Sequence, residues 1–314
     1  MSAELQPIHQ EPKSFVWKYL FSQDHKMIAK QFLWTGLIFL LVGGTLAMMI
    51  RWQWAYPKAP VPVLGQLLLK STGGQITPPT YTSIFTMHGL IMIFWAITPI
   101  LIGAFGNLCI PLMIGARDMA FPKLNMYSYW AFFISSVFVI LSFTSQLGAA
   151  SAGWTTYPPL SSNVGAPGWG QTYMAVAIFT TGVSTIMGGI NYIVTIIRFR
   201  APGMTYMRMP LTIWGLWLTA ILNVLFVPVL GSGALLVTLD RLAGTHFFIA
   251  GGADVYRQTL PIAARVLLTD IDLEVSGDAH FPALNADHWT VHSRVEMSGA
   301  DGTRFAVVDY RRRG

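Results

Sequence analysis

Residues 31–50 read QFLWTGLIFLLVGGTLAMMI, a run without a charged side chain that ends at Arg51. A helix needs about 20 mostly apolar residues to cross the hydrocarbon core of a bilayer. A charge at the centre of such a helix costs on the order of 3 kcal/mol, so a long uncharged run is informative. This stretch therefore predicts a membrane-spanning helix.

Four further uncharged, apolar runs follow along the chain. They cover roughly residues 83–114, 127–147, 172–197 and 211–239. Residues 153–170 are rich in Gly, Pro and Ser, which indicates a loop between the second and third of these runs. The sequence thus predicts an all-α polytopic membrane bundle of five transmembrane helices.

Positive charges are unevenly distributed over the connecting segments. The amino-terminal arm and the loops after the second and fourth spans carry nine Lys and Arg residues, whereas the opposite loops carry three. Because cytoplasmic loops are enriched in Lys and Arg, we expect the amino terminus in the cytoplasm. Five spans then place the carboxy-terminal tail outside.

The composition changes near Phe248. Residues 1–248 contain 13 Lys and Arg and 5 Asp and Glu, whereas residues 249–314 contain 7 Arg, 9 Asp and Glu, and no Lys. Apolar and polar residues alternate over 265–272 and 304–310, a pattern typical of β-strands. We therefore expect a membrane domain over 1–248 and a small α/β fragment over 249–314.

The remaining composition excludes several classes of protein. A net charge of +6 and a pI near 9.5 would suit nucleic-acid binding. Basic loops that orient membrane helices explain the same excess, so we expect no nucleic-acid partner and instead a lipid environment. The single cysteine, Cys109, excludes an intrachain disulfide and a cysteine-rich zinc site.

His88 is a polar residue within the second apolar run. A histidine at membrane depth is a candidate functional residue. It could serve as an axial ligand of haem iron, since neutral imidazole binds iron. It could equally be a histidine that forms a hydrogen bond at a contact between helices, and the residue alone leaves both interpretations open.

Seven short motifs occur in a fixed order along the membrane part. They are Phe21–Lys26, Thr86–Gly89, Gly106–Leu108, Ile114–Pro122, Gly153–Ser161, Gly189–Tyr192 and Leu239–Arg241. Together they resemble subunit I of the haem–copper respiratory oxidases over about residues 18–248. The resemblance is closest to cytochrome c oxidase subunit I of the bacterial or mitochondrial type.

The resemblance implies roles for individual residues. His88 would be one of two axial ligands of a low-spin haem, of the haem a type, and Arg51 would interact with its formyl group. Trp154 and Tyr157 would lie in the outer loop near the haems.

The same resemblance implies a proton pathway. Asp118 would form its mouth, and Asn107 and Asn125 would line the route. The charge pattern agrees, because it places Asp118 on the cytoplasmic side. Without the surrounding motif, Asp118 could equally be a helix cap.

The resemblance also implies partners and a location. Oxidase subunits II and III would bind this chain, with cytochrome c or quinol as electron donor, in the bacterial plasma membrane or the mitochondrial inner membrane. The family further needs a second ligand of the low-spin haem, a ligand of the high-spin haem and three copper ligands. The other histidines are not placed to replace them, because His9 and His25 fall in the arm, His246 ends the last span, and His280, His288 and His292 belong to the tail. We therefore expect a truncated oxidase component, inactive alone.

The tail carries a second pattern. Gly251 and Gly252 precede Asp254-Val255-Tyr256, which indicates a turn that opens a helix, either a plain turn or a phosphate site. With Leu260-Pro261, 268–272, 277–282 and Trp289, it resembles the carboxy-terminal part of dihydrofolate reductase. That resemblance implies that Gly251 and Gly252 contact the NADPH phosphates, and that Tyr256 and Thr269 line the cofactor and folate sites. The family's amino-terminal portion does not precede this stretch, so we expect NADPH binding only if the tail is functional.

Three interpretations remain open. The favoured one is a chimera of a truncated oxidase subunit I and a reductase fragment. The second is a non-enzymatic membrane protein that binds one haem loosely or none. The third is a dihydrofolate reductase-like, NADPH-dependent oxidoreductase on a membrane anchor.

Overall fold

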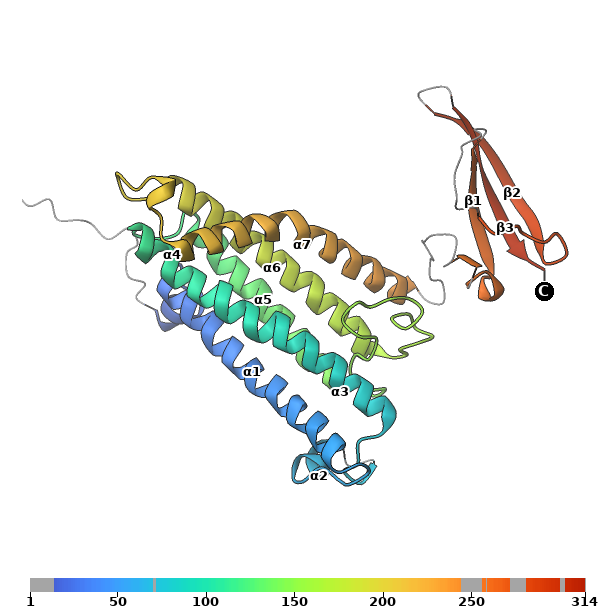
Figure 1. Ribbon diagram of the computed structural model, residues 1–314, viewed down its shortest axis with the longest axis horizontal. Coiled ribbons are helices and arrows are strands. Elements are labelled where there is room, and N and C mark those ends of the chain that lie inside the picture. Colours follow the sequence, from blue (N-terminus) through green and yellow to red (C-terminus); the bar gives the residue numbers. More distant parts are fainter. Residues whose placement is uncertain are drawn as a thin grey trace, which may run out of the picture. The chain divides into compact units, whose positions relative to one another are not determined.

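The computed structural model describes residues 14–69, 72–243, 256–257, 259–271, 281–299 and 303–313. The chain divides into two compact units, residues 1–247 and 248–314. Figure 1 draws the helical elements of the first unit and the strands of the second.

Five helical segments of the described chain are long and apolar enough to cross a membrane. They are α1 (His25–Ala55), the compound segment Pro78–Ile114, α5 (Pro122–Phe143), α6 (Trp169–Arg198) and α7 (Leu211–Ala243). The five predicted spans are thereby confirmed, although helix bounds differ by several residues from the uncharged runs. The chain is an integral membrane protein.

The compound second segment is wound in two ways. It consists of α3 (Pro78–Leu90), the π-helical turns η3 (Ile91–Ile97) and η4 (Pro99–Gly106), and α4 (Asn107–Ile114). Pro99 has no N–H group, so it cannot donate to the preceding turn. The residue before it, Thr98, donates to the Ile93 carbonyl with both its backbone amide and its hydroxyl, the latter at 2.7 Å. π-helical turns are frequent at functional sites.

The ends of the helices follow from local sequence. The Asp24 carboxylate accepts a hydrogen bond from the Lys26 amide and so caps α1. Thr77 caps α3 in the same way, and Pro78 fills the first helical position, where no N–H is needed. Gly115 ends α4 with a φ of 73°, a left-handed conformation that favours glycine. The shorter elements of the described chain are η1 (Val16–Leu20), α2 (Leu64–Leu68), η5 (Tyr206–Arg208) and η6 (Leu260–Ile262).

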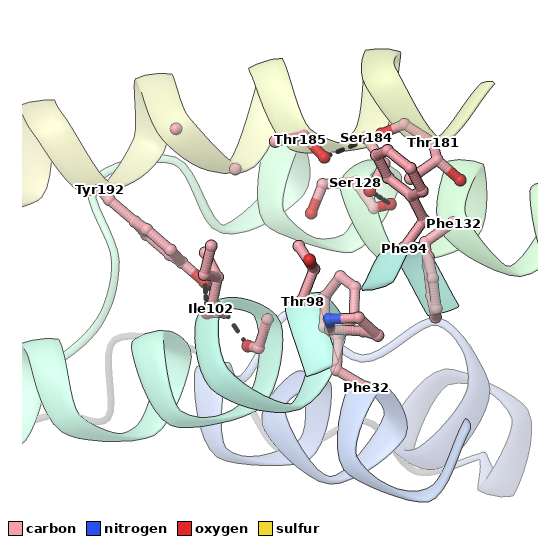
Figure 2. A pocket seen from close by; sticks show the side chains of 14 residues that line it. Phe32, Phe94, Thr98, Ile102, Ser128, Phe132, Thr181, Ser184, Thr185 and Tyr192 are labelled. Atoms are coloured by element: carbon pink, nitrogen blue, oxygen red, sulfur yellow. Dashed lines mark hydrogen bonds between the residues drawn. The ribbon is translucent and has the colours of Figure 1, made fainter. Parts of the chain in front are cut away.

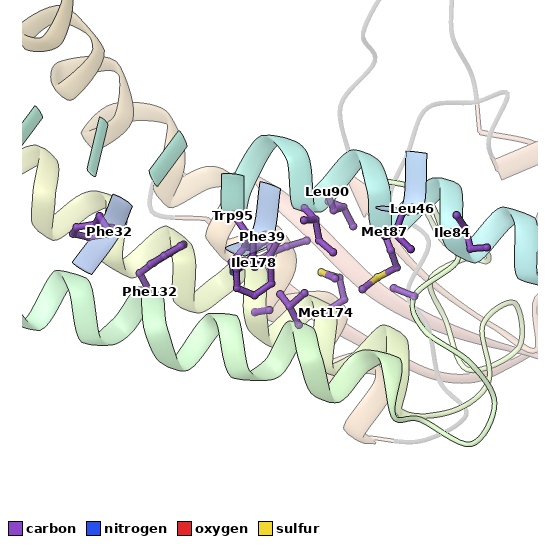
Figure 3. Packing of buried hydrophobic residues seen from close by; sticks show 14 of the residues in the cluster. Phe32, Phe39, Leu46, Ile84, Met87, Leu90, Trp95, Phe132, Met174 and Ile178 are labelled. Carbon is purple, nitrogen blue, oxygen red and sulfur yellow. The ribbon is translucent and has the colours of Figure 1, made fainter. Parts of the chain in front are cut away.

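A continuous apolar core lies between α1, the second segment, α5 and α6 (Figure 3). Met87, Leu90, Trp95 and Met174 are completely buried in it. The Trp95 indole N–H donates to the Ser135 hydroxyl at 3.1 Å, which satisfies the polar end of this side chain inside the core. These contacts fix the second segment, and with it His88, against its neighbours.

The second unit contains a three-stranded antiparallel sheet. Its strands are β1 (Arg265–Ile271), β2 (Trp289–Ser298) and β3 (Arg304–Arg312), in the order β1-β3-β2. The two predicted strands are confirmed, whereas β2 was not predicted as a strand. The helix predicted after Gly252 begins outside the described residues.

One ion pair ties β1 to β3. The Arg265 Nε donates to the buried Asp309 carboxylate at 2.8 Å. This hydrogen bond, together with the charges of Arg265 and Arg311, holds the pKa of Asp309 below its usual value.

Candidate functional site

His88 lies on α3 and faces α1. Its Nδ1 is 2.9 Å from the carbonyl oxygen of Gly43. Because a carbonyl can only accept, Nδ1 carries the proton and Nε2 keeps its lone pair. A neutral imidazole oriented by a hydrogen bond at one nitrogen can bind a metal through the other. The contact agrees with both interpretations of His88, since one nitrogen joins two helices and the other remains available.

The position of Gly43 depends on its lack of a side chain. A Cβ at this residue would lie 2.6 Å from Sδ of Met92 and 3.3 Å from Cγ2 of Ile91. Glycine thus allows α1 to approach the second segment closely enough for the carbonyl of Gly43 to reach His88.

Arg51 lies near the end of α1 and is exposed. It is eight residues beyond Gly43, roughly 12 Å along the helix axis. Its guanidinium lies 6.0 Å from the centre of the Trp54 ring. The side chain is therefore on the same helix as the partner of His88 and open to a further contact.

Trp154 and Tyr157 lie in the loop 144–168 between α5 and α6, as predicted, and are 62% and 70% exposed. They line a cavity of about 520 Å³ against α6 and α7. This volume is within the range of cofactor and ligand sites. The Gly153 amide donates to the Thr86 hydroxyl at 3.1 Å, which ties the loop to the helix that carries His88.

Asp118 forms a contact that the sequence did not reveal. Its Oδ1 lies 3.1 Å from Nδ1 of His25 and accepts the amide of Met119 at 2.7 Å. His25 was assigned to the arm, and that assignment is wrong: it is the first residue of α1 and only 3% exposed. The helix-cap interpretation of Asp118 is also wrong for α5, whose N-cap residue is Phe121.

Asn107 and Asn125 are brought together in the bundle interior. The Asn125 amide donates to Oδ1 of Asn107 at 2.6 Å, and the Asn107 amide donates to the Tyr192 hydroxyl at 2.9 Å. All three residues are at most 2% exposed. Tyr192 in turn donates to the Ile102 carbonyl at 2.8 Å.

A third buried asparagine, Asn191, precedes Tyr192 on α6. Its Oδ1 accepts the Phe121 amide at 2.9 Å. Its Nδ2 and the Oδ1 of Asn125 are buried without a partner among the described side chains and backbone. Buried polar groups are usually satisfied, so a donor and an acceptor of this kind suit ordered water. Asn191 belongs to the motif Gly189–Tyr192, but the sequence alone predicted no role for it.

Beyond the asparagines lies a small internal cavity of about 40 Å³, lined by η3, η4, α1, α5 and α6 (Figure 2). Figure 2 shows the hydroxyl groups of Thr98, Ser128 and Ser184 around it, with Tyr192 at one end. A cavity that holds a water needs about 10–15 Å³, so this one has room for two or three. Two residues that line it, Gly103 and Tyr192, also accept hydrogen bonds from the side-chain amide of Asn107.

The predicted residues of the tail are only partly described. Gly251 and Gly252 lie outside the described residues. The Tyr256 ring lies 5.3 Å from that of Phe281, whereas Thr269 is paired with Val307 in the sheet. These two residues thus take part in different contacts. In the described part of the whole chain, no group of three or more His, Cys, Asp and Glu side chains is arranged to hold a metal ion.

Comparisons with known proteins bear on both units. The family model for cytochrome c and quinol oxidase polypeptide I matches residues 27–262, and that for dihydrofolate reductase matches residues 232–312. The two matches overlap over residues 232–262, which include the predicted change at Phe248.

Curated relatives match the membrane part. An alternative cytochrome c oxidase subunit 1 of Bradyrhizobium diazoefficiens is 39% identical over 240 residues, which cover 76% of this chain and 38% of the relative. A haem–copper oxidase subunit I+III of Aeropyrum pernix is 39% identical over 242 residues, 76% of this chain and 28% of the relative. Quinol oxidase subunit 1 of Bacillus subtilis is 40% identical over 243 residues, 75% of this chain and 35% of the relative.

The chain thus spans about two fifths or less of the length of these relatives. The family model nevertheless covers most of the chain, and the match includes most of α1 and the other four membrane-spanning segments. The chain belongs to the family of cytochrome c and quinol oxidase polypeptide I, and its tail matches the dihydrofolate reductase family.

Proposed function

We propose that residues 1–248 form the amino-terminal membrane domain of an oxidase subunit I, and that residues 249–314 form a reductase-like fragment joined to it. The function is that of a respiratory oxidase component, which couples electron transfer to oxygen with proton translocation. Relatives named cytochrome c oxidase and quinol oxidase subunits support this proposal.

The observation that carries the proposal is the hydrogen bond between His88 and Gly43. With Nδ1 bonded to this carbonyl, Nε2 of His88 would hold the iron of a low-spin haem, of the haem a type. Arg51 would contact the formyl group of this haem, and Trp154 and Tyr157 would lie near it. A haem held there would supply one-electron transfer, and the Gly43 carbonyl would orient its histidine ligand.

A proton pathway supplies the proton part of the function. We assign its mouth to Asp118 and its lining to Asn107 and Asn125. Hydrogen bonds link the two asparagines to each other and to Tyr192. The cavity at Ser128 and Ser184 supports this proposal, because Tyr192, a partner of Asn107, also lines it.

These 314 residues by themselves would not reduce oxygen. His88 is the one histidine in the interior of an apolar run, so the membrane part offers one axial ligand. The donor set of this part does not fit a copper ion, and we derive no step through copper. The remaining ligands would come from outside this sequence.

The setting follows from the family and the charge pattern. We place the protein in a bacterial plasma membrane or a mitochondrial inner membrane, with its amino terminus in the cytoplasm and its tail outside. Oxidase subunits II and III would be its partners, and cytochrome c or quinol would be the electron donor.

A haem titration tests the central assignment. Purified protein in detergent is titrated with haem, and the shift of the haem absorbance band is measured for the native chain, for His88→Ala and for His292→Ala. His292 is exposed on β2 and serves as the control. We expect the band shift to be lost only in His88→Ala. Equal binding by all three proteins contradicts the assignment, and a bis-histidine spectrum from this chain contradicts the single ligand.

The family match of the tail supports a second candidate, an NADPH-dependent reductase. Its site would use Gly251, Gly252, Tyr256 and Thr269. The test is NADPH oxidation in the presence of dihydrofolate, followed by the absorbance of the reduced cofactor. We expect no turnover, because the amino-terminal portion of the reductase family does not precede this stretch. Turnover that is lost in Thr269→Ala would instead establish the reductase.

A further inference from the structure

Arg241 is a charged residue buried at the end of α7. It is 5% exposed, although α7 is otherwise an apolar membrane helix. A charge at such a place is tolerated only when its hydrogen bonds are satisfied. The partners of Arg241 therefore indicate what the residue does.

The guanidinium group binds one end of the loop 144–168. Its Nη1 donates to the Ser161 carbonyl at 2.7 Å, and its Nη2 donates to the carbonyls of Ala166, at 2.9 Å, and Gly168, at 2.5 Å. Its Nε donates to the Thr172 hydroxyl at 2.8 Å, on the first turns of α6. The Arg241 side chain thus connects α7 both to three backbone carbonyls of the loop and to α6.

The loop also binds back to the helix. The Asn163 side-chain amide donates to the backbone carbonyl of Arg241 at 3.0 Å. The carbonyls near the end of a helix lack partners within the helix. The end of α7 and the second half of the loop therefore provide hydrogen-bond partners for each other's polar groups.

The first half of the loop is held separately. The Ser83 hydroxyl donates to the Ala149 and Ala150 carbonyls, at 3.1 and 3.2 Å. The Gly153 amide donates to Thr86, and the Ser151 amide donates to Gln171 at 3.2 Å. The segment 154–160 lies between these two anchors and carries the exposed aromatic side chains.

This segment forms one wall of the cavity of about 520 Å³. Trp154, Thr155, Thr156 and Tyr157 face Ala175 and Ile178 of α6 and a stripe of α7 that includes Gly233 and Ala234. Because Trp154 and Tyr157 are largely exposed, their own packing does little to fix the wall. Its position depends on the anchors at either side.

We propose that Arg241 is a positioning residue: its hydrogen bonds to Ser161, Ala166 and Gly168 hold the segment 154–160 in place as the aromatic wall of this cavity. A planar guanidinium suits this role because its five N–H groups diverge in a fixed geometry. Lysine, with its three donors on one nitrogen, could not reach the same set of acceptors.

A spin label on the wall tests the proposal without haem, so failure of haem binding and failure of this inference are distinguishable. Cys109 is first replaced by Ser, and Thr155→Cys then carries a nitroxide on the exposed wall. In Arg241→Gln we expect the rotational correlation time of the label to shorten about threefold, toward the nanosecond motion of a free loop. In Arg241→Lys we expect an intermediate value.

Arg200→Gln is the matched control. Arg200 also donates to backbone carbonyls, those of Ile196 and Met204, but at the other end of α6. This variant should leave the label at residue 155 unchanged. Equal motion of the label in the native chain and in Arg241→Gln overturns the proposal.

A second label separates local loosening from loss of the fold. Leu112→Cys places it on α4, where the side chain is exposed. If Arg241→Gln mobilises this label as well, Thr172→Val is used instead, since it removes one of the four acceptors. We then expect a smaller change at residue 155 and none at residue 112, and no change at residue 155 overturns the proposal.

Discussion

Nδ1 of His25 lies 3.1 Å from Oδ1 of Asp118, across 93 positions of the sequence. The contact joins the first turn of α1 to the segment before α5. Both side chains are largely withdrawn from solvent, at 4% and 12% exposure. The pair therefore fixes the carboxylate that we assign to the mouth of the proton route.

Removing either member of this pair is expected to destabilise the bundle. His25→Gln or Asp118→Asn leaves a buried polar group poorly satisfied, which costs about 1–3 kcal/mol. In the double variant the loss is expected to be smaller than the sum, with a coupling energy of about 0.5–3 kcal/mol. Unfolding in mixed detergent micelles, followed by circular dichroism, gives the three values. Strict additivity would show that the two side chains do not interact.

The hydroxyl of Tyr192 connects Asn107 to the Ile102 carbonyl. Tyr192→Phe removes one acceptor and one donor inside the bundle, and we expect a loss of about 1 kcal/mol of unfolding free energy. Tyr173→Phe on the same helix is the control, because the Tyr173 ring packs on Trp169 through its face. The same detergent unfolding measurement compares them. Equal effects of the two substitutions would contradict a role for the Tyr192 hydroxyl in the network.

The sequence predicts those parts of the fold that leave a pattern in the order of apolar and charged residues. Five uncharged runs identify five spans, because burying a charge in hydrocarbon is costly whatever the neighbours are. The π-helical winding of Ile91–Gly106 leaves no such trace, since an apolar run looks the same at either pitch. Strand β2 was missed because Ser293 interrupts the alternation of its apolar residues, at the point where the pairing with β3 shifts register.

The candidate site likewise contains residues that the sequence predicted and residues that only the structure revealed. The resemblance implies that Asn107 and Asn125 line one route, and the structure brings their side chains into contact. His25 and Arg241 act through partners far away in sequence, which spacing along one chain does not reveal. A charged residue at the end of an apolar, membrane-spanning run is the signal in the sequence that could have indicated a role for Arg241.

The sheet of the tail is expected to lose stability in acid. The pKa of Asp309 is lowered in the folded protein, so its stabilising effect is present above the unfolded value of about 3.9 and is lost as pH falls through the folded value. Arg265→Gln removes the hydrogen bond that lowers this pKa, so the folded value moves toward the unfolded one and the loss of stability in acid should be smaller. Amide exchange of β1 and β3 against pH measures the size of this loss.

Arg294→Gln is the control for that measurement. Arg294 lies 3.3 Å from Asp270, but both side chains are at least half exposed. Exposed pairs of this kind contribute little. The acid profile should therefore stay where it is in the native chain. If amide exchange depends on pH in the same way in Arg265→Gln and Arg294→Gln, the bond from Arg265 to Asp309 does not contribute to the stability of the sheet in acid.

Gly43 and Gly44 are neighbours on α1 with opposite surroundings. An added Cβ at Gly43 would meet Met92 and Ile91, whereas one at Gly44 would meet nothing within 4 Å. Gly43→Ala should thus destabilise the bundle by about 1–3 kcal/mol, the cost of overpacking, toward the lower end because Met92 is flexible. Gly44→Ala should stabilise α1 by roughly 0.5–1 kcal/mol, because alanine loses less backbone entropy than glycine.

The same two variants report on His88. Pushing α1 away from the second segment lengthens the 2.9 Å bond from His88 to the Gly43 carbonyl and frees the ring to rotate. Haem affinity in the titration should therefore fall in Gly43→Ala and stay unchanged in Gly44→Ala. A fall in both variants would mean that the membrane-facing side of α1 matters. A fall in neither would mean that the Gly43 carbonyl does not orient the ligand, because the close approach of the two helices would then have no consequence for His88.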